Sequence, residues 1–209
     1  MCPQFNQPFR CLSDEQRVRH LDEVRASIDA SEPLWIFGYG SLLWRPCYEV
    51  SATRVVTLSG FRRSLCIWTI EATGSVDSPG LGLGLMREAS AACVGHAHRI
   101  EPAHHGEALA ALWEREMLTG IYLPAWVSVA VDGQAVHALT FVVDPTHPQF
   151  AGDLDETTQA KFIASAVGAL GTNAEYVSAT VAALKDAGIS DPSLEAVDNA
   201  VRARLFGRA

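Results

Sequence analysis

The stretch WIFGYGSLLWRP, from Trp35 to Pro46, decides how the rest of the chain is interpreted. It begins inside an apolar run, LWIFG, that is typical of a buried strand. The run then reaches GYGS, residues 38–41, a sequence suited to a tight turn, and becomes apolar again. Two explanations are open: a strand corner that needs glycine, or a backbone that lies closely against a ligand.

Two familiar motifs that this turn resembles are incomplete. A nucleophile elbow around Ser41 needs glycine two residues on each side, and Leu43 occupies the second of these places. Leu43 also stands where the third glycine of a GxGxxG dinucleotide-binding motif should be, and no alternating strand–helix pattern follows. The turn therefore predicts neither a serine hydrolase nor a dinucleotide-binding protein.

Length and charge narrow the class of protein. The chain has 209 residues, of which 48% are hydrophobic, enough for one domain with a full core. A formal net charge of −8 without a Lys/Arg cluster argues against a nucleic-acid partner. The N-terminus lacks an apolar segment of signal-peptide length, and no stretch is long and apolar enough for a membrane span. We therefore expect a soluble cytoplasmic protein with no membrane partner.

Helical patterns flank a region of strands. Ser13 and Gln16 form a capping-box pattern that begins a helix reaching about Ala30. Seven segments indicate strands, the last two joined by an Asp132-Gly133 hairpin turn: LWIFG, TRVVTLSG, FRRSLCIWTI, LGLGLM, ACVGHAHRI, AWVSVAVDG and AVHALTFVVD. A helix near residues 107–118 interrupts the strands, and three more helices follow Asp155.

This order of elements predicts the fold class and the domain organisation. Because the strands do not alternate regularly with helices, a doubly wound sheet is not expected. We expect an α+β protein with a small, mostly antiparallel, barrel-like sheet flanked by helices and a C-terminal helical layer. Residues 1–33 would be an N-terminal helical extension of unassigned role, and residues 34–209 a single domain. The oligomeric state is not determined by these patterns.

The helix HGEALAALWEREMLTG carries a carboxylate on its apolar face. At about 100° per residue, Leu109, Leu112, Trp113 and Met117 share one arc, and Glu116 falls inside it, whereas Arg115 falls outside. Burial of an unpaired carboxylate costs several kcal/mol and would raise its pKa toward neutrality, which suits a general acid/base. The alternatives are a salt bridge to a core-facing arginine or an exposed helix end.

Histidines, cysteines and further glycines give weaker signals. His96 and His98 would point to the same side of a strand, with His104-His105 in the next loop, so a metal site is an alternative to surface or hydrogen-bonded histidines. The five cysteines include no CxxC pair; Cys66 and Cys93 are expected in the core, and Cys47 lies near the turn: Cys2, Cys11, Cys47, Cys66, Cys93. The period-2 glycines of GLGLGL, residues 80–85, indicate close packing rather than a phosphate loop.

Six segments, in order, resemble one family. They are WIFGYGSLLWRP, PGLGLGL, LWEREMLTGIYLPAWV, ALTFVVD, HPQFAG and NAEYV, and together they are similar to the bacterial ChaC branch of the γ-glutamylcyclotransferases. The resemblance covers roughly Leu34 to Leu205, so residues 34–209 would form a ChaC-like domain. It implies a small β-barrel flanked by helices. It also implies release of 5-oxoproline from a γ-glutamyl peptide, with glutathione as the usual substrate, Cys-Gly as the other product, and no metal or organic cofactor.

The resemblance also implies roles for particular residues. The catalytic glutamate of the family corresponds to Glu116. The substrate-binding turn corresponds to Phe37, Gly38, Tyr39, Gly40, Ser41 and Leu42. Tyr122, just after the helix, is a further candidate for a substrate hydrogen bond, or else a half-buried barrel aromatic. We expect the backbone N–H groups of the turn to hold the α-carboxylate of the γ-glutamyl group, whose own α-amine attacks the γ-carbonyl.

Several positions depart from the pattern of the family. Thr73, Leu123 and Ala125 stand where arginine is common, and His98 and Phe150 replace usual tyrosines. Arginine is the natural bidentate partner of a carboxylate, so recognition of the remote glycine carboxylate of glutathione is left open. The alternatives are therefore a cyclotransferase for other γ-glutamyl peptides or amines and a non-catalytic γ-glutamyl-binding protein.

Overall fold

The computed structural model describes Phe5 and residues 7–207 and divides the chain into two compact units. The first, here called the sheet unit, consists of Arg10–Arg63 and Leu85–Asp144. The second, the helical unit, consists of Ser64–Gly84 and the residues from Pro145 onward, with the N-terminal segment that ends at Phe9. Each unit is thus assembled from segments that are distant in the sequence.

The five long strands form one mixed sheet in the order β2-β3-β1-β5-β4. Their bounds are β1 (Leu34–Gly38), β2 (Ala52–Thr69), β3 (Gly80–Ile100), β4 (Tyr122–Val131) and β5 (Gln134–Val143). The central strand β1 pairs antiparallel with β3 and parallel with β5. The predicted hairpin turn joins β4 and β5, with positive φ angles at Asp132 (51°) and Gly133 (81°), as a type I′ turn requires.

Two pairs of predicted strands are continuous strands instead. TRVVTLSG and FRRSLCIWTI form the single strand β2, and LGLGLM and ACVGHAHRI form the single strand β3. Gly60, which suggested a break, lies within β2 with φ of 81°, and a Cβ atom added there would meet nothing within 4 Å. A glycine in this conformation lets a strand bend without ending, so the prediction of a break there was wrong.

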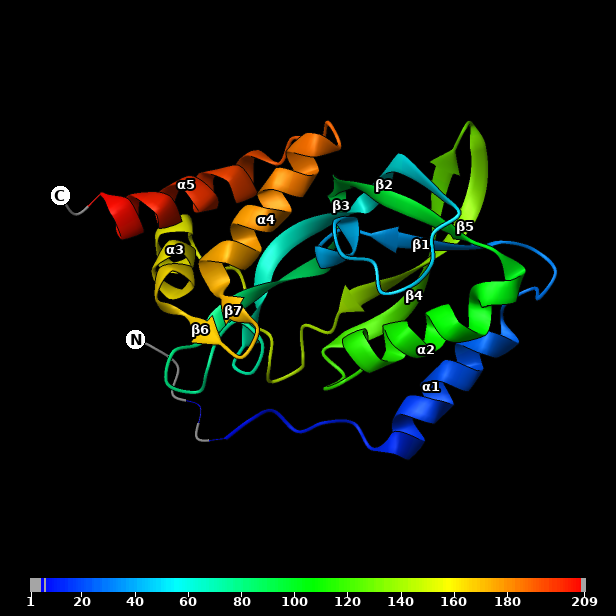
Figure 1. Ribbon diagram of the computed structural model, residues 1–209, viewed down its shortest axis with the longest axis horizontal. Coiled ribbons are helices and arrows are strands. Elements are labelled where there is room, and N and C mark those ends of the chain that lie inside the picture. Colours follow the sequence, from blue (N-terminus) through cyan, green and yellow to red (C-terminus); the bar gives the residue numbers. More distant parts are fainter. Residues whose placement is uncertain (1–4, 6, 208–209) are drawn as a thin grey trace. The chain divides into compact units, whose positions relative to one another are not determined.

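The described residues of the sheet unit include two α-helices and two short 3₁₀ turns. Helix α1 (Asp14–Ala26) begins with the predicted Ser13–Gln16 capping box and ends four residues before Ala30. Helix α2 (His105–Glu116), which follows the 3₁₀ turn η2 (Pro102–His104), packs beside α1 (Figure 1). The Leu12 N–H also donates to the Leu118 carbonyl, 2.9 Å away. The N-terminal helix is therefore attached to the helix that carries Glu116.

The helical unit contains α3 (Glu156–Ser165), α4 (Asn173–Asp186) and α5 (Pro192–Phe206), which contact one another (Figure 1). Thr172 and Glu175 form a second capping box, and Asp191 caps α5 ahead of Pro192. Helix α3 is shorter than predicted, because residues 166–172 form a small hairpin of β6 (Val167–Gly168) and β7 (Gly171–Thr172). Cys66 lies buried in this unit and Cys93 in the sheet unit, as predicted.

Both edges of the sheet contribute to one core cluster. Val56 and Leu58 from β2 and Val127 and Val129 from β4 belong to the same buried cluster, together with Phe37 from the central strand. The fold is therefore a mixed α+β arrangement with a curled five-stranded sheet, and pairing between β2 and β4 that would close a barrel is not seen among the described strands. In the described part of the chain, no helix has the length and apolar character that a membrane span requires.

Candidate active site

The turn after β1 folds back on itself as a short 3₁₀ helix. Strand β1 ends at Gly38, and η1 (Ser41–Leu43) begins after Gly40. A Cβ atom at Gly38 would lie 3.0 Å from Leu42 Cβ, which is tighter than ordinary packing, so glycine favours the close return of the chain there. Gly95 on β3 is required for a similar reason, since its Cβ would lie 2.5 Å from the Gly38 carbonyl oxygen. No local sequence pattern predicts the need for Gly95, because this contact is made between two strands.

Glu116 ends helix α2 and is largely enclosed. Its side chain is 14% exposed, and the neighbouring Met117 and Trp113 are buried, so the apolar-arc prediction correctly found a carboxylate with little access to water. Burial raises the pKa of the Glu116 carboxyl, and the positive charge of Arg115 opposes that rise. The carboxylate is paired, since Arg115 Nε lies 3.3 Å from Glu116 Oε1.

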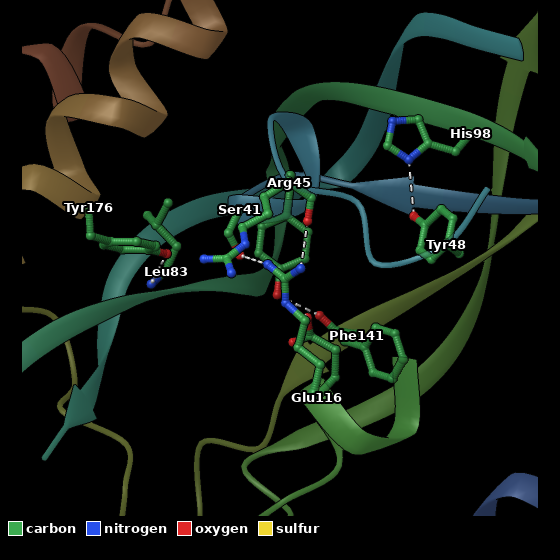
Figure 2. A network of polar contacts seen from close by, with 10 residues as sticks. Ser41, Arg45, Tyr48, Leu83, His98, Glu116, Phe141 and Tyr176 are labelled. Carbon is green, nitrogen blue, oxygen red and sulfur yellow. Dashed lines mark hydrogen bonds and ion pairs between the residues drawn. The ribbon is translucent and has the colours of Figure 1, made fainter. Parts of the chain in front are cut away.

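Arg115 connects the helix to the turn. Its Nη2 donates to Ser41 Oγ (2.5 Å) and its Nη1 donates to the Arg45 carbonyl (2.6 Å), while Nε faces Glu116. Figure 2 shows Ser41, Arg45 and Glu116 close together around these contacts. The guanidinium therefore brings the predicted catalytic glutamate and the predicted substrate turn into one site. The helical position of Arg115 outside the apolar arc gave no sign of this, because a long side chain can reach back over the helix end.

Cys47 and Tyr48 lie next to the Arg115–Glu116 pair. Burial raises the pKa of the Cys47 thiol; Arg115, which is also its hydrogen-bond partner, lowers it, and the Glu116 charge raises it. Burial also raises the pKa of the Tyr48 phenol, with smaller contributions from Cys47 and Glu116. The Tyr48 hydroxyl is 3.0 Å from His98 Nδ1 (Figure 2). Both side chains thus stay neutral near the ion pair at ordinary pH.

Of the four histidines considered for a metal site, His96 and His98 are neighbours, with ring centres 5.7 Å apart, whereas His104 and His105 have other partners. His98 is buried against Tyr48, and burial together with the nearby His96 lowers its pKa to about 4. His105 Nε2 accepts a hydrogen bond from the Leu34 N–H, whereas His104 lies 3.7 Å from the Glu49 carboxylate. Among Phe5 and residues 7–207, no three His, Cys, Asp or Glu side chains are arranged to hold a metal ion. Cys2 lies outside the described residues.

The side chains of three other predicted substrate-binding residues, Phe37, Tyr39 and Tyr122, are buried or half-buried. The ring of Phe37 is fully buried, and its carbonyl accepts a hydrogen bond from Thr140 Oγ1, 2.9 Å away. The Tyr39 hydroxyl donates to the Phe141 carbonyl (2.9 Å), so its side chain anchors the turn. Tyr122 begins β4 and packs, half-buried, against the cluster that contains Leu42 and Met117. Phe37 and Tyr39 are thus placed as supports of the turn.

Three arginines of β2 and β3 have partners within the sheet unit. Arg63 donates to the Tyr39 carbonyl (2.5 Å) and the Val94 carbonyl (2.6 Å), so a second guanidinium holds the turn. Arg62 pairs with Glu88 at 2.6 Å. The guanidinium of Arg87 lies over the Phe61 ring, 5.0 Å from its centre. In the helical unit, Thr73, which stands where the family commonly has arginine, accepts a hydrogen bond from Asn173 Nδ2 (3.0 Å).

Known proteins are similar to this chain over most of its length. The glutathione-specific γ-glutamylcyclotransferase of Escherichia coli K12 is 37% identical over 87% of this chain and 78% of its own. The human glutathione-specific γ-glutamylcyclotransferase 1 is 32% identical over 70% of this chain and 67% of its own. A crystal structure of a glutathione-specific γ-glutamyl cyclotransferase from yeast has a TM-score of 0.76 at 19% identity, covering 84% of this chain and 98% of that one, which shows a shared fold.

A family model gives the assignment directly. The model described as ChaC-like protein matches residues 34–204, which include the turn after β1, Glu116 and all of α3 and α4. The two relatives are each more than 30% identical to this chain and match 87% and 70% of it. The chain therefore belongs to the ChaC family.

Proposed function

We propose that this protein is a glutathione-specific γ-glutamylcyclotransferase, which converts glutathione to 5-oxoproline and Cys-Gly. The observation that carries the proposal is the largely enclosed Glu116 carboxylate held beside the glycine turn by Arg115, in a chain of the ChaC family. Two curated relatives with this activity in their names cover most of the chain.

The turn after β1 binds the γ-glutamyl group in this proposal. The first N–H groups of a 3₁₀ turn have no partner inside the helix, and around η1 they belong to residues 40–42. These N–H groups donate hydrogen bonds to the α-carboxylate of the substrate. Gly38 allows the chain to turn sharply toward Leu42. The side chains of Phe37 and Tyr39 are buried in the protein core and so fix the backbone of the turn. Tyr122, which packs against the buried cluster that contains Leu42 and Met117, contributes a hydroxyl for a hydrogen bond to the substrate.

The reaction needs no nucleophile from the protein. The α-amino nitrogen of the substrate attacks the γ-carbonyl carbon and forms the five-membered lactam ring, while the amide bond to the cysteine nitrogen breaks. Holding amine and carbonyl within reach of each other supplies much of the rate acceleration. Glu116 accepts a proton from the α-ammonium and returns one to the departing amine, so that no water is consumed. A raised pKa brings this carboxyl closer to the pH at which both transfers are easy.

Finer features of the family follow as parts of the same proposal. The sheet closes into a small barrel, which is supported by the shared cluster of β2 and β4 and by the Arg54–Asp132 pair (3.0 Å) between β2 and the end of β4. Residues 34–209 act as one catalytic domain to which residues 1–33 attach, and the enzyme works in the cytoplasm on a small molecule. The activity uses no metal or organic cofactor.

A product assay tests the proposal. The purified protein is incubated with millimolar glutathione and EDTA, and 5-oxoproline and Cys-Gly are measured by mass spectrometry. Equal amounts of both products are expected. Absence of both with glutathione, but release of 5-oxoproline from another γ-glutamyl peptide or amine, would reassign the substrate. Absence of 5-oxoproline with every γ-glutamyl compound would contradict the cyclotransferase and favour a γ-glutamyl-binding protein.

A further inference from the structure

Arg115 has a role that its position in the sequence does not suggest. All three nitrogens of its guanidinium have different partners: Nε faces Glu116, Nη1 donates to the Arg45 carbonyl, and Nη2 donates to Ser41 Oγ. Its side chain is 26% exposed, less than the 47% of the surface arginine Arg54. Such a planar donor group fixes its partners in direction as well as distance.

We infer that Arg115 is a positioning residue, whose guanidinium holds the Glu116 carboxylate at a fixed place relative to the turn formed by residues 38–45. This inference rests on the proposed function for its catalytic consequence. Without the guanidinium, the carboxylate at the end of α2 has no hydrogen-bond link to the turn, and the two parts can shift relative to each other. A shift of about 1 Å in a catalytic group can lower a rate about a hundredfold.

Electrostatics supports the same role. The titratable or charged groups that act on Glu116 or respond to it are Arg115 on its own helix and Cys47 and Tyr48 from the segment after η1. Of these, only Arg115 carries a charge at neutral pH. It therefore favours the ionised carboxylate that must accept the first proton, against a burial that favours the neutral acid.

The arginine is tested with two substitutions and a matched control. Arg115→Gln is expected to lower kcat about a hundredfold with little change in KM, and to move the ascending limb of the kcat/KM–pH profile to higher pH, because the charge that favours ionised Glu116 is lost. Arg115→Lys keeps the charge but loses the planar, fixed arrangement of donors of the guanidinium, so kcat is expected to fall while the ascending limb moves less. Arg54→Gln removes a surface arginine of the same unit and is expected to leave both kcat and the limb unchanged.

A binding role or a purely structural role would give other results. A rise in KM with unchanged kcat in Arg115→Gln would overturn the inference and assign Arg115 to the substrate carboxylate. A folded variant with lower kcat but an unmoved limb would also overturn it, since the arginine would then not act through Glu116.

A second measurement does not depend on activity. The pKa of the Glu116 carboxyl, followed by NMR with isotope-labelled glutamate, is expected to be higher in Arg115→Gln than in the wild type, and an equal value overturns the inference. If Arg115→Gln does not fold, Arg115→Lys is combined with Ser41→Ala. The losses in kcat are expected to be non-additive, and additive losses overturn the inference. Because the NMR result stands even if no γ-glutamyl compound is cleaved, failure of the proposed function remains distinguishable.

Discussion

The turn after β1 and the loop between β2 and β3 are both glycine-containing connections, but they are held by different chemistry. In the sheet unit, the turn is held by the guanidinium of Arg115, which also faces the Glu116 carboxylate. In the helical unit, the loop is held by the neutral amide of Asn173, which donates to Thr73 Oγ1 and the Leu81 carbonyl and accepts from the Leu81 N–H.

The two regions differ in whether the group that holds the backbone can take part in proton transfer. The Asn173 side chain is fully buried, and each of these hydrogen bonds joins neutral groups. The amide therefore fixes the loop but cannot act as an acid or a base. The turn is fixed by an ion pair that includes a titratable carboxyl with a raised pKa. Only the turn therefore combines a fixed backbone with a group that can move protons. Substitutions in the two regions should accordingly affect different properties, activity in one and stability in the other.

The largest effect is expected at Glu116. Glu116→Gln keeps the size and hydrogen-bonding shape of the side chain but removes its ability to accept a proton, so kcat should fall about 10²- to 10⁴-fold while substrate binding and the fold remain. Steady-state kinetics and isothermal titration with glutathione measure the two properties. The control is Glu114→Gln, an exposed acid on the same helix, for which wild-type kinetics are expected. Wild-type turnover in Glu116→Gln would remove the difference between the two regions.

Asn173→Ala should act on stability. It leaves the Leu81 N–H and carbonyl without their buried partner, at a cost of about 2–3 kcal/mol in the free energy of unfolding. Urea denaturation measures this cost. Thr73→Ala, which removes one acceptor of the same amide, should cost less, about 1 kcal/mol. A loss at Asn173 no larger than that at Thr73 would show that the amide does not hold the loop.

Gly38→Ala tests how tightly the turn is packed. The new methyl group would lie 3.0 Å from Leu42 Cβ and should displace residues 40–42, raising KM for glutathione about tenfold, which corresponds to roughly 1.4 kcal/mol. Gly106→Ala on α2 is the matched control, because its Cβ meets nothing within 4 Å. That control should keep its KM, and an equal KM in Gly38→Ala would argue against the turn as the carboxylate site.

The smallest effect is a pH-dependent difference in stability. Because burial raises the pKa of Glu116 in the folded state, the folded protein binds more protons than the unfolded one at pH values between the two pKa values. The contribution of the Glu116 carboxyl to the free energy of unfolding of the wild type is therefore lost as pH rises through that interval. Glu116→Gln should have a higher Tm than the wild type at pH 7, and the gap should shrink toward pH 4. A gap that widens on acidification would contradict the raised pKa.

Local signals in the sequence predicted much of the fold. The Ser13–Gln16 capping box, the Asp132-Gly133 turn and Asp191-Pro192 at α5 all lie where short-range chemistry placed them. Helical periodicity likewise found the enclosed Glu116. These features depend on residues within a few positions of one another, and a sequence displays them directly.

The remaining features depend on contacts between distant residues. Gly60 continues β2 only because the flanking residues stay paired in the sheet, and Gly95 is needed because the Gly38 carbonyl approaches it across β1 and β3. The reach of Arg115 to Ser41 spans 74 positions, and that of Asn173 to Thr73 spans 100. The periodicity of hydrophobic residues does not predict contacts between residues so far apart in the sequence. The resemblance to the ChaC family implied a substrate-binding role for the turn, which stays a prediction, but gave no sign of the arginine that connects the turn to Glu116.

The most direct test of the account follows the oxygen atoms of the product. The protein is incubated with glutathione in heavy-oxygen water, and the released γ-glutamyl product is identified and weighed by mass spectrometry. If the substrate supplies its own nucleophile, the product is 5-oxoproline without heavy oxygen, and Glu116→Gln forms almost none of it. Release of glutamate that carries heavy oxygen would show attack by water, and would contradict the cyclisation on which the roles of the turn and of Glu116 depend.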